Sequence, residues 1–405
     1  MTGFAVRPIT DEERRPTFTL LRQALHSPPP DDEFWRQHGD AWVADHKFGA
    51  FAGDRPIGIT GSFDTDLVVP GGARLSTAAV DGVAVRADWT RRGVVSELMR
   101  VQLQDFAARG HALAALYPSE AAIYGRFGYG AATLGRTIRV EHPARLRPGV
   151  PATGTVRLLD ETTAAAQLPA LYQQCATTRP GRLGRPAAWW PIERNRQIRY
   201  GAGYRVAVHT GHNGEDDGFV VFRSRERATL DQPDRRAALD VRDLIGAGPA
   251  AVTGLWRFLL SIDLTGTVLA RDRPVDEPVG ALLTDPRRAH TDAVTDQLWL
   301  RLVDVPAALA ARTYGAAEPV VLALTDRQLP ANTGRYLIGP GGAHRTQAPA
   351  ELDLDAEALG QLYLGEWRAS TLWQAGRLTA ADPSAAARAD ALFTTERPPW
   401  CGTHF

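Results

Sequence analysis

The sequence predicts a mixed fold of helices and strands, of the α/β (α+β) class. Over the first 140 residues, short apolar runs typical of strands alternate with segments whose apolar residues recur at helical spacing. Turn signals, GDRP at 53–56 and PGG at 70–72, separate the strand-like runs. The chain has 405 residues, 44% hydrophobic and 23% charged, which is enough for two or three domains with cores of their own.

Two helices and a three-stranded meander are expected first. Helical spacing of apolar residues runs over 12–27, where SPPPDD interrupts it, and a short helix is expected over 33–38. Three strand-like segments follow at 41–53, 56–69 and 73–85. The short turns between them predict antiparallel pairing.

A helix, a buried strand, a short helix and another strand follow. Apolar residues recur at helical spacing over 94–107, and Gly110 is a plausible C-cap. The apolar run at 112–118 is short enough for a buried strand. A short helix is expected over 121–126 and a strand over 128–141.

The later part of the chain is marked less clearly. Its Pro and Gly content predicts that 142–154 is a linker. A mixed segment follows, in which 228–263 predicts a strand and then a helix. A third segment begins near residue 296 with DQLWLRLVDVPAALAARTY.

Composition excludes several classes of protein. The 46 basic residues balance 46 acidic ones, which argues against a nucleic-acid binder or a polybasic membrane binder. Cys175 and Cys401 are the only cysteines, so neither a disulfide framework nor a Cys-x-x-Cys metal site is expected, and we expect no metal. The N-terminus is polar, and no apolar run approaches the ~20 residues of a membrane span. A soluble, cytoplasmic protein is predicted.

The segment DWTRRGVV at 88–95 predicts an anion site. The first N–H groups of a helix have no intrahelical partner, and a glycine lets the backbone approach a ligand. Neither the G-x-G-x-x-G pattern nor a P-loop occurs, and the preceding meander is not a doubly wound nucleotide fold. The pyrophosphate of coenzyme A remains as the ligand, and an ordinary basic turn remains as the alternative.

Two stretches resemble a known family. VAVRADWTRRGVVSELM at 83–99 resembles motif A of the GNAT N-acetyltransferases, whose core reads Q/R-x-x-G-x-G/A, although Thr90 and Val95 depart from it. PSEAAIYGRFGYGAAT at 118–133 is more specific. Together with VPAALAAR, LYLGEWRASTL and a terminal phenylalanine, it resembles the Eis (enhanced intracellular survival) family of acetyltransferases.

The resemblance implies three parts and an activity. The parts are a GNAT acetyltransferase domain at 1–143, a second GNAT-like domain without a cofactor site at 144–296, and a sterol-carrier-protein-like domain at 297–405 whose C-terminus enters the active site. The implied assembly is a homohexamer. The implied reaction is direct transfer of an acetyl group from acetyl-CoA to an amine of a cationic polyamine, with aminoglycoside antibiotics as a candidate class.

The resemblance places acetyl-CoA along one strand and the turn after it. Backbone groups of 83–85 would pair with the pantetheine arm, and the Val85 N–H could face the thioester carbonyl. The turn would hold the pyrophosphate. The expected cofactor-binding residues are Val83, Ala84, Val85, Arg91, Arg92, Gly93, Val94, Val95, Ser96, Ser119 and Glu120.

Two groups are expected to move protons. The amine must lose a proton, because its pKa is near ~10.4, and the leaving thiolate should gain one. The resemblance assigns the acid to Tyr124, with Tyr129 as an alternative that packs along the next strand. It assigns the base to the C-terminal carboxylate of Phe405, with His404 second. Cys401 is not expected to be a nucleophile.

Acceptor binding is assigned to Trp35, Asp81 and His404, since cation–π and carboxylate contacts suit polyamines. Two other classes of function stay open. One is a carrier of lipids or small molecules centred on the third part, and the other is a regulatory oligomer with a vestigial acetyltransferase domain.

Overall fold

The computed structural model describes residues 3–42, 46–151, 154–175, 179–191, 203–225 and 236–405. The chain divides into two compact units. The first unit holds residues 1–132, 298–395 and 405, and the second unit holds residues 133–297 and 396–404. Within the described residues, no helix has both the length and the apolar character that crossing a membrane requires.

The first unit contains a seven-stranded sheet in the order β1-β2-β3-β4-β5-β14-β6. The antiparallel meander is confirmed, with strands β2 (Phe48–Ala52), β3 (Arg55–Val68) and β4 (Arg74–Val85). The first strand, predicted at 41–53, is shorter: Ala41 ends a 3-10 helix, residues 43–45 lie outside the described residues, and β2 begins at Phe48. An edge strand that the sequence analysis did not predict, β1 (Ala5–Pro8), pairs antiparallel with β2.

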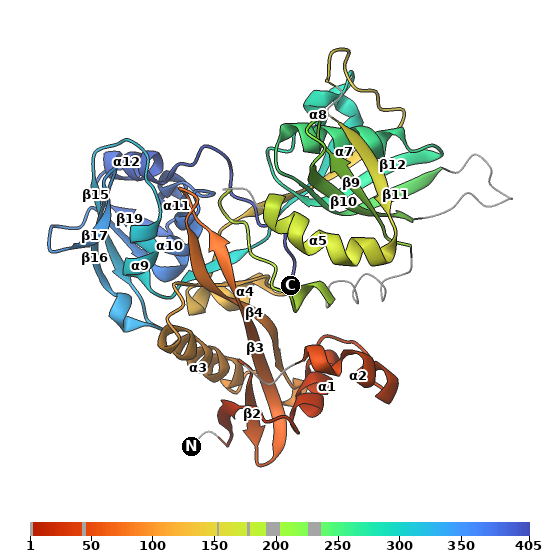
Figure 1. Cartoon of the computed structure of the whole chain (residues 1–405). Coiled ribbons are helices and arrows are strands. Elements are labelled where there is room, and N and C mark those ends of the chain that lie inside the picture. Colours follow the sequence, from red (N-terminus) through yellow and green to blue (C-terminus); the bar gives the residue numbers. More distant parts are fainter. Residues whose placement is uncertain (1–2, 43–45, 152–153, 176–178, 192–202, 226–235) are drawn as a thin grey trace. The chain divides into compact units, whose positions relative to one another are not determined.

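The predicted helices of this part are confirmed as α1 (Arg14–Ala24), α2 (Asp32–His38) and α3 (Val94–Ala108). Helix α3 buries an apolar face against the meander (Figure 1). Gly110 follows its last turn with φ +76°, and the N–H groups of Gly110 and His111 donate to Ala107 and Phe106 at 3.1 and 3.0 Å. This pattern is a Schellman C-cap.

The strand predicted over 128–141 is two strands in different sheets, so that prediction is wrong. The short β6 (Gly130–Ala131) pairs in the first sheet, whereas β7 (Leu134–Glu141) pairs in the second. The physical reason is a change of partners. Strand β6 pairs with β14 (Trp299–Leu302), which comes from the third part of the chain and also pairs with β5 (Leu113–Leu116).

The second unit is built on another seven-stranded sheet, in the order β13-β7-β12-β11-β10-β9-β8. Alternate residues of β10 point into different cores: Val220 and Phe222 pack with helix α7, and Phe219 and Val221 pack with helix α5. The two helices therefore cover opposite faces of the sheet. The elements not yet given are β8 (Thr155–Leu159), α5 (Glu161–Cys175), β9 (Arg205–Thr210), β10 (Asp216–Arg225), β11 (Ala237–Gly246), α7 (Pro249–Ser261), β12 (Thr265–Arg273), α8 (Val279–Leu282) and β13 (Ala289–Asp296).

A five-stranded sheet, in the order β17-β16-β15-β18-β19, completes the first unit. Its strands and helices are α9 (Val305–Ala311), β15 (Val320–Thr325), β16 (Gly334–Gly339), β17 (Gly342–Thr346), β18 (Leu352–Asp355), α10 (Ala356–Tyr363), α11 (Ala369–Gln374), β19 (Leu378–Ala380) and α12 (Pro383–Phe393). Buried Arg312 donates to the last carbonyls of α10 and α12, those of Tyr363 and Phe393. It thereby satisfies orphan groups at two helix ends.

Candidate active site

Strands β4 and β5 are parallel but separate after a short pairing. The pairing joins only Thr77–Ala79 of β4 to Leu113–Ala115 of β5. Along its other edge, β5 pairs with β14. Among the described residues, the last part of β4 therefore has no neighbour on its β5 side. This open edge contains Val83, Ala84 and Val85, where the pantetheine arm is expected.

A β-bulge changes the direction of β4 where its open edge begins. Thr60 of β3 stands opposite both Gly82 and Val83, and Gly82 has φ +68°. Beyond the bulge, the N–H of Arg86 donates to the carbonyl of Ile57 at 2.9 Å. Because the direction of backbone groups alternates along a strand, the N–H of Val85 points toward the open edge.

The turn before α3 offers unpaired N–H groups to a ligand. The helix starts at Val94 after Gly93 at φ +83°, and the N–H of Glu97 donates to the carbonyl of Gly93 at 3.0 Å. The N–H groups of Val94, Val95 and Ser96 precede that first helical bond and have no intrahelical acceptor. A methyl group at Gly93 would meet nothing within 4 Å, so the left-handed backbone is what requires glycine there.

Two arginines flank this turn. Arg91 has φ +61°, a conformation that costs an L residue about 1–2 kcal/mol. The guanidinium of Arg92 lies 5.0 Å from the ring of Trp89, and both arginines are exposed. The turn thus combines positive side chains, left-handed backbone and a helix N-terminus, which together suit an anion.

Tyr124 ends the short helix α4 (Ala121–Tyr124) and is 7% exposed. It packs in one apolar cluster with Val80 of β4 and Met99 of α3. Burial, and secondarily the charge of Glu120, raise the pKa of its hydroxyl. Ser119 and Glu120, just before α4, are exposed.

Tyr129, the alternative acid, is fully buried. Its ring meets that of Tyr124 edge to face at 6.3 Å. Burial raises its pKa, and its hydroxyl has no hydrogen-bond partner in the described part of the chain. Tyr124, being the less buried of the two, is the better candidate to reach a substrate.

Asp81 lies beside the bulge with one carboxylate oxygen, Oδ1, that is buried and has no hydrogen-bond partner among the described residues. A methyl group at Gly61 on β3 would lie 2.7 Å from this oxygen and 3.2 Å from Cγ of Lys47. Lys47 is the only lysine of the chain, and its Nζ lies 4.4 Å from the ring centroid of Trp42. Asp81 and Lys47 therefore flank the same point of β3.

Trp35 belongs to an aromatic cluster of α1 and α2. Its ring lies 5.8 Å from that of Phe18, which lies 5.1 Å from that of Trp42. Trp42, which the sequence analysis missed, also reaches the bulge, since a methyl group at Gly82 would lie 3.0 Å from its ring. From the sequence, Trp42 was placed inside the strand predicted at 41–53, whereas β2 begins only at Phe48.

The segment 396–404 is held inside the second unit. Arg179 donates to the carbonyl of Pro398 at 2.7 Å, and Arg185 donates to the carbonyl of Gly402 at 2.9 Å. The hydroxyl of Tyr172 lies 2.9 Å from Oγ1 of Thr403. This segment is therefore anchored, and sequence analysis missed the residues that anchor it.

His404 and Phe405 fall in different units. The carbonyl of His404 accepts a hydrogen bond from the indole of Trp189 at 3.1 Å within the second unit. Phe405 belongs to the first unit, where its ring packs edge to face against Phe63 at 5.5 Å and Tyr117 at 5.2 Å. Of the expected site residues, all but His404 belong to the first unit.

Models of protein families match the chain in three places. An acetyltransferase (GNAT) domain matches residues 5–132, a second acetyltransferase (GNAT) domain matches 181–302, and a sterol carrier protein domain matches 305–402. The sheet with its open β4 edge and these matches define an N-acetyltransferase of the GNAT class with a C-terminal sterol-carrier-like domain, so the predicted fold class is confirmed.

Individual relatives identify the family. The N-acetyltransferase Eis of Mycobacterium tuberculosis is 35% identical over 362 residues, which cover 86% of this chain and 86% of the relative. An uncharacterized N-acetyltransferase of Streptomyces coelicolor is 40% identical over 356 residues, 85% of this chain and 84% of the relative. The crystal structure of Eis1 from Mycobacterium abscessus superposes with a TM-score of 0.90 at 35% identity, covering 99% of this chain and all of the other. The chain belongs to the Eis family of N-acetyltransferases.

The GNAT fold implies acetyl-CoA as the acetyl donor, and the open edge and turn suit its pantetheine arm and pyrophosphate. In the described residues, no group of three or more His, Cys, Asp or Glu side chains is arranged to hold a metal ion.

Proposed function

We propose that this N-acetyltransferase moves the acetyl group of acetyl-CoA directly to an amine of a cationic polyamine, with aminoglycosides as one candidate class, in a ternary complex. The observation that carries the proposal is the open edge of β4, which ends at a left-handed turn and a helix N-terminus. Extended backbone followed by an anion cradle suits a long ligand with amide groups at one end and phosphates at the other.

The donor would lie along residues 83–96. Acetyl-CoA supplies an acetyl thioester, and the N–H of Val85 points to the edge where the carbonyl oxygen of that thioester would need a donor. The N–H groups of 94–96, with Arg91 and Arg92, would bind the pyrophosphate. Ser119 and Glu120 are exposed beside α4 and would border the donor.

Tyr124 is proposed as the acid that protonates the leaving sulfur. A tyrosine hydroxyl is protonated at physiological pH even at its ordinary pKa, and burial, which raises the pKa of Tyr124, preserves that state, as an acid requires before the reaction. Its packing against β4 and α3, the two elements that would hold the donor, supports this role.

The α-carboxylate of Phe405 is proposed as the proton acceptor, and this assignment rests on the family resemblance. An α-carboxylate has a pKa near ~3.5, so it needs desolvation or a water relay to accept a proton from an ammonium ion. The rings of Phe63 and Tyr117 against Phe405, and the anchored segment before it, argue against a frayed tail. His404 is the second candidate.

Direct transfer is favoured over a covalent acyl-enzyme. Cys401 is fully buried, and its thiol donates to the carbonyl of Thr403. Burial raises the pKa of the other thiol, that of Cys175, to about 11. Neither cysteine is thus poised as an acyl carrier, because the thiolate is the nucleophile.

The acceptor is proposed to bind through its positive charge. The unpaired oxygen of Asp81 would receive an ammonium group, and the ring of Trp35 offers a cation–π surface. The family resemblance also supports a cytoplasmic homohexamer, which light scattering can test against the chain mass of 44.0 kDa.

Release of the free thiol of CoA tests the function. The enzyme should release thiol from acetyl-CoA with polyamines and aminoglycosides, and much more slowly with a neutral monoalcohol of similar size. Turnover that stays at the background rate of hydrolysis for every amine would favour a carrier or a regulatory oligomer instead.

A further inference from the structure

The loop that follows Tyr124 contains three glycines, in the sequence YGRFGYG. A methyl group at each of them would run into the third part of the chain. At Gly125 it would strike the carboxylate of Glu357, and at Gly128 it would lie 3.0 Å from Cζ of Arg301. At Gly130 it would strike the backbone carbonyl of Glu357. The third part of the chain is therefore packed directly on this loop.

Helix α10 approaches the strands beneath it with no side chain in between. A methyl group at Gly360 of α10 would strike the carbonyl of Leu300 on β14 and lie 3.1 Å from the backbone nitrogen of Gly130 on β6. Backbone is the obstacle on both sides, so no flexible side chain could swing away to make room. The position of α10 thus fixes the position of β6, the strand into which the loop runs.

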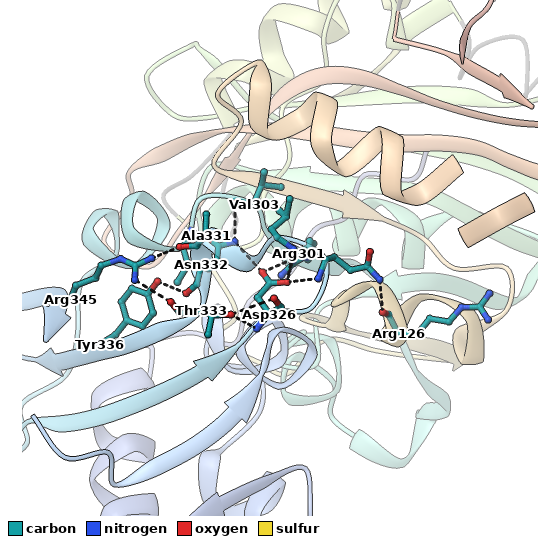
Figure 2. A network of polar contacts seen from close by, with 12 residues as sticks. Arg126, Arg301, Val303, Asp326, Ala331, Asn332, Thr333, Tyr336 and Arg345 are labelled. Carbon is teal, nitrogen blue, oxygen red and sulfur yellow. Dashed lines mark hydrogen bonds and ion pairs between the residues drawn. The ribbon is translucent and has the colours of Figure 1, made fainter. Parts of the chain in front are cut away.

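Arg301 supports the same loop from β14. Its guanidinium is completely buried, and one nitrogen donates to both carboxylate oxygens of Asp326 at 2.7 and 2.6 Å (Figure 2). Asp326 is fixed in turn by the N–H groups of Gln328 and Leu329 and by the amide of Asn332. The other two nitrogens of Arg301, Nε and Nη1, have no hydrogen-bond partner among the described residues, so the pair with Asp326 and the surrounding packing hold the guanidinium in place as a platform.

The loop rests on that platform. Gly128 lies against Arg301. The side-chain amide of Gln328 reaches the carbonyl of Arg126 at 3.4 Å, a contact drawn as a dashed line in Figure 2. The N–H of Tyr129 donates to the carbonyl of Tyr124 at 3.3 Å, and the two tyrosine rings meet edge to face. A displacement of Gly128 or Gly130 is therefore transmitted to Tyr124 through Tyr129.

We propose that the chain from residue 298 onward, which contains the sterol-carrier-like domain, positions Tyr124 for catalysis, and that Arg301 on β14 and the Gly360 contact of α10 are the positioning elements. The inference rests on the proposed role of Tyr124 as the acid. The residues assigned to the donor, which are 83–96, Ser119 and Glu120, include neither element. Disturbing either element lowers kcat and leaves the affinity for acetyl-CoA unchanged.

Gly360→Ala tests the inference. Alanine is the better helix former, so the substitution harms the protein only by pushing α10 away from β6 and β14. A misplacement of about 1 Å can cost a reaction on the order of 100-fold, and we expect kcat to fall roughly 10- to 100-fold. The matched control is Gly341→Ala in the same unit, where a methyl group would meet nothing within 4 Å. It should leave kcat unchanged.

A second pair of variants covers the case in which Gly360→Ala does not fold. Arg301→Lys keeps a charge for Asp326 but removes the planar group beneath Gly128, and it should lower kcat in the same way. Its matched control is Arg388→Lys, an arginine of the same unit whose partners, Glu351 and the carbonyl of Pro319, belong neither to the loop nor to α10. That control should change stability without a fall in kcat.

The Tyr124→Phe background separates this inference from the proposed function. If the elements act through Tyr124, Gly360→Ala and Arg301→Lys will change the residual rate of Tyr124→Phe by less than about twofold. Equal fold-losses of kcat in the wild-type and Tyr124→Phe backgrounds would overturn the positioning role alone. A wild-type kcat of folded Gly360→Ala and Arg301→Lys, while Tyr124→Phe is inactive, would do the same. Near wild-type turnover of Tyr124→Phe itself would instead overturn the acid assignment.

Discussion

Arg185 is predicted to control whether the segment 396–404 stays docked in the second unit. Its guanidinium donates to the carbonyl of Gly402 at 2.9 Å and to Oγ1 of Thr403 at 3.1 Å, and it pairs with Asp243 at 2.6 Å. Arg185→Met removes both hydrogen bonds to the segment. A hydrogen bond from a charged donor contributes about 1.5–3 kcal/mol, so docking should weaken by at least ~3 kcal/mol.

The buried thiol of Cys401 reports the change. It is labelled only when the segment detaches, and ~3 kcal/mol corresponds to about a hundredfold larger detached population. In a Cys175→Ala background, we therefore expect thiol labelling of Arg185→Met to be about a hundred times faster than that of the parent. The control is Arg157→Met, which breaks an exposed pair with Asp216 in the same unit. A labelling rate equal to that of the parent, in a folded variant, would refute the docking account.

Three further predictions concern the donor site, the acid and the fold. Gly93→Ala forces an L residue to φ +83°, at a cost of about 1–2 kcal/mol, so the KM for acetyl-CoA should rise about tenfold. The control Gly341→Ala should leave this KM unchanged. An unaltered KM for Gly93→Ala would argue against the turn at Gly93 as the pyrophosphate site. Because burial raises the pKa of Tyr124, its hydroxyl loses its proton only above the ordinary tyrosine value of 10.0, and the pH profile of kcat should show no alkaline decline centred below that pH. An alkaline decline of kcat centred below pH 10.0 would contradict the role of Tyr124. Arg312→Met leaves the carbonyls of Tyr363 and Phe393 without their donor, at a cost of about 1–3 kcal/mol each. Urea denaturation should show a decrease of that order in the free energy of unfolding, which the control Arg327→Met, at an exposed position, does not share. Equal free energies of unfolding for Arg312→Met and the parent would show that water replaces the arginine.

Local patterns in the sequence predicted local structure well. The second and third strands of the meander, α3 with its Gly110 cap, β5 and α4 follow from periodicity and turn residues within a few positions of their bounds, whereas the first strand begins seven residues later than predicted. A turn leading into a helix was expected at Gly93 from a glycine between arginines and apolar residues, but its left-handed backbone was not predicted. Each of these features depends on interactions between residues close together in the sequence.

Pairings between distant segments could not be predicted in the same way. Nothing in WLRL at 299–302 states that this strand lies between β5 and β6, and nothing in GYGAATLGRTIRVE shows that its two halves join different sheets. The glycines of the Tyr124 loop are likewise explained only by their contacts with Arg301 and α10. Alternation of residues fixes which face is buried, but it does not name the partner.

Acetyl transfer is predicted to depend on a proton acceptor at the carboxylate of Phe405. A short C-terminal tag keeps the aromatic ring of Phe405 and converts its carboxylate to an amide, whereas deleting Phe405 moves the carboxylate by up to ~3.6 Å. The measurement is kcat for CoA release with a polyamine, together with the Kd for acetyl-CoA, for the tagged, shortened and unaltered enzymes. We predict a fall in kcat of roughly 10²–10⁴-fold for both changes, an unchanged Kd, and a smaller loss for His404→Ala. A tagged enzyme that turns over as fast as the untagged one would contradict the claim.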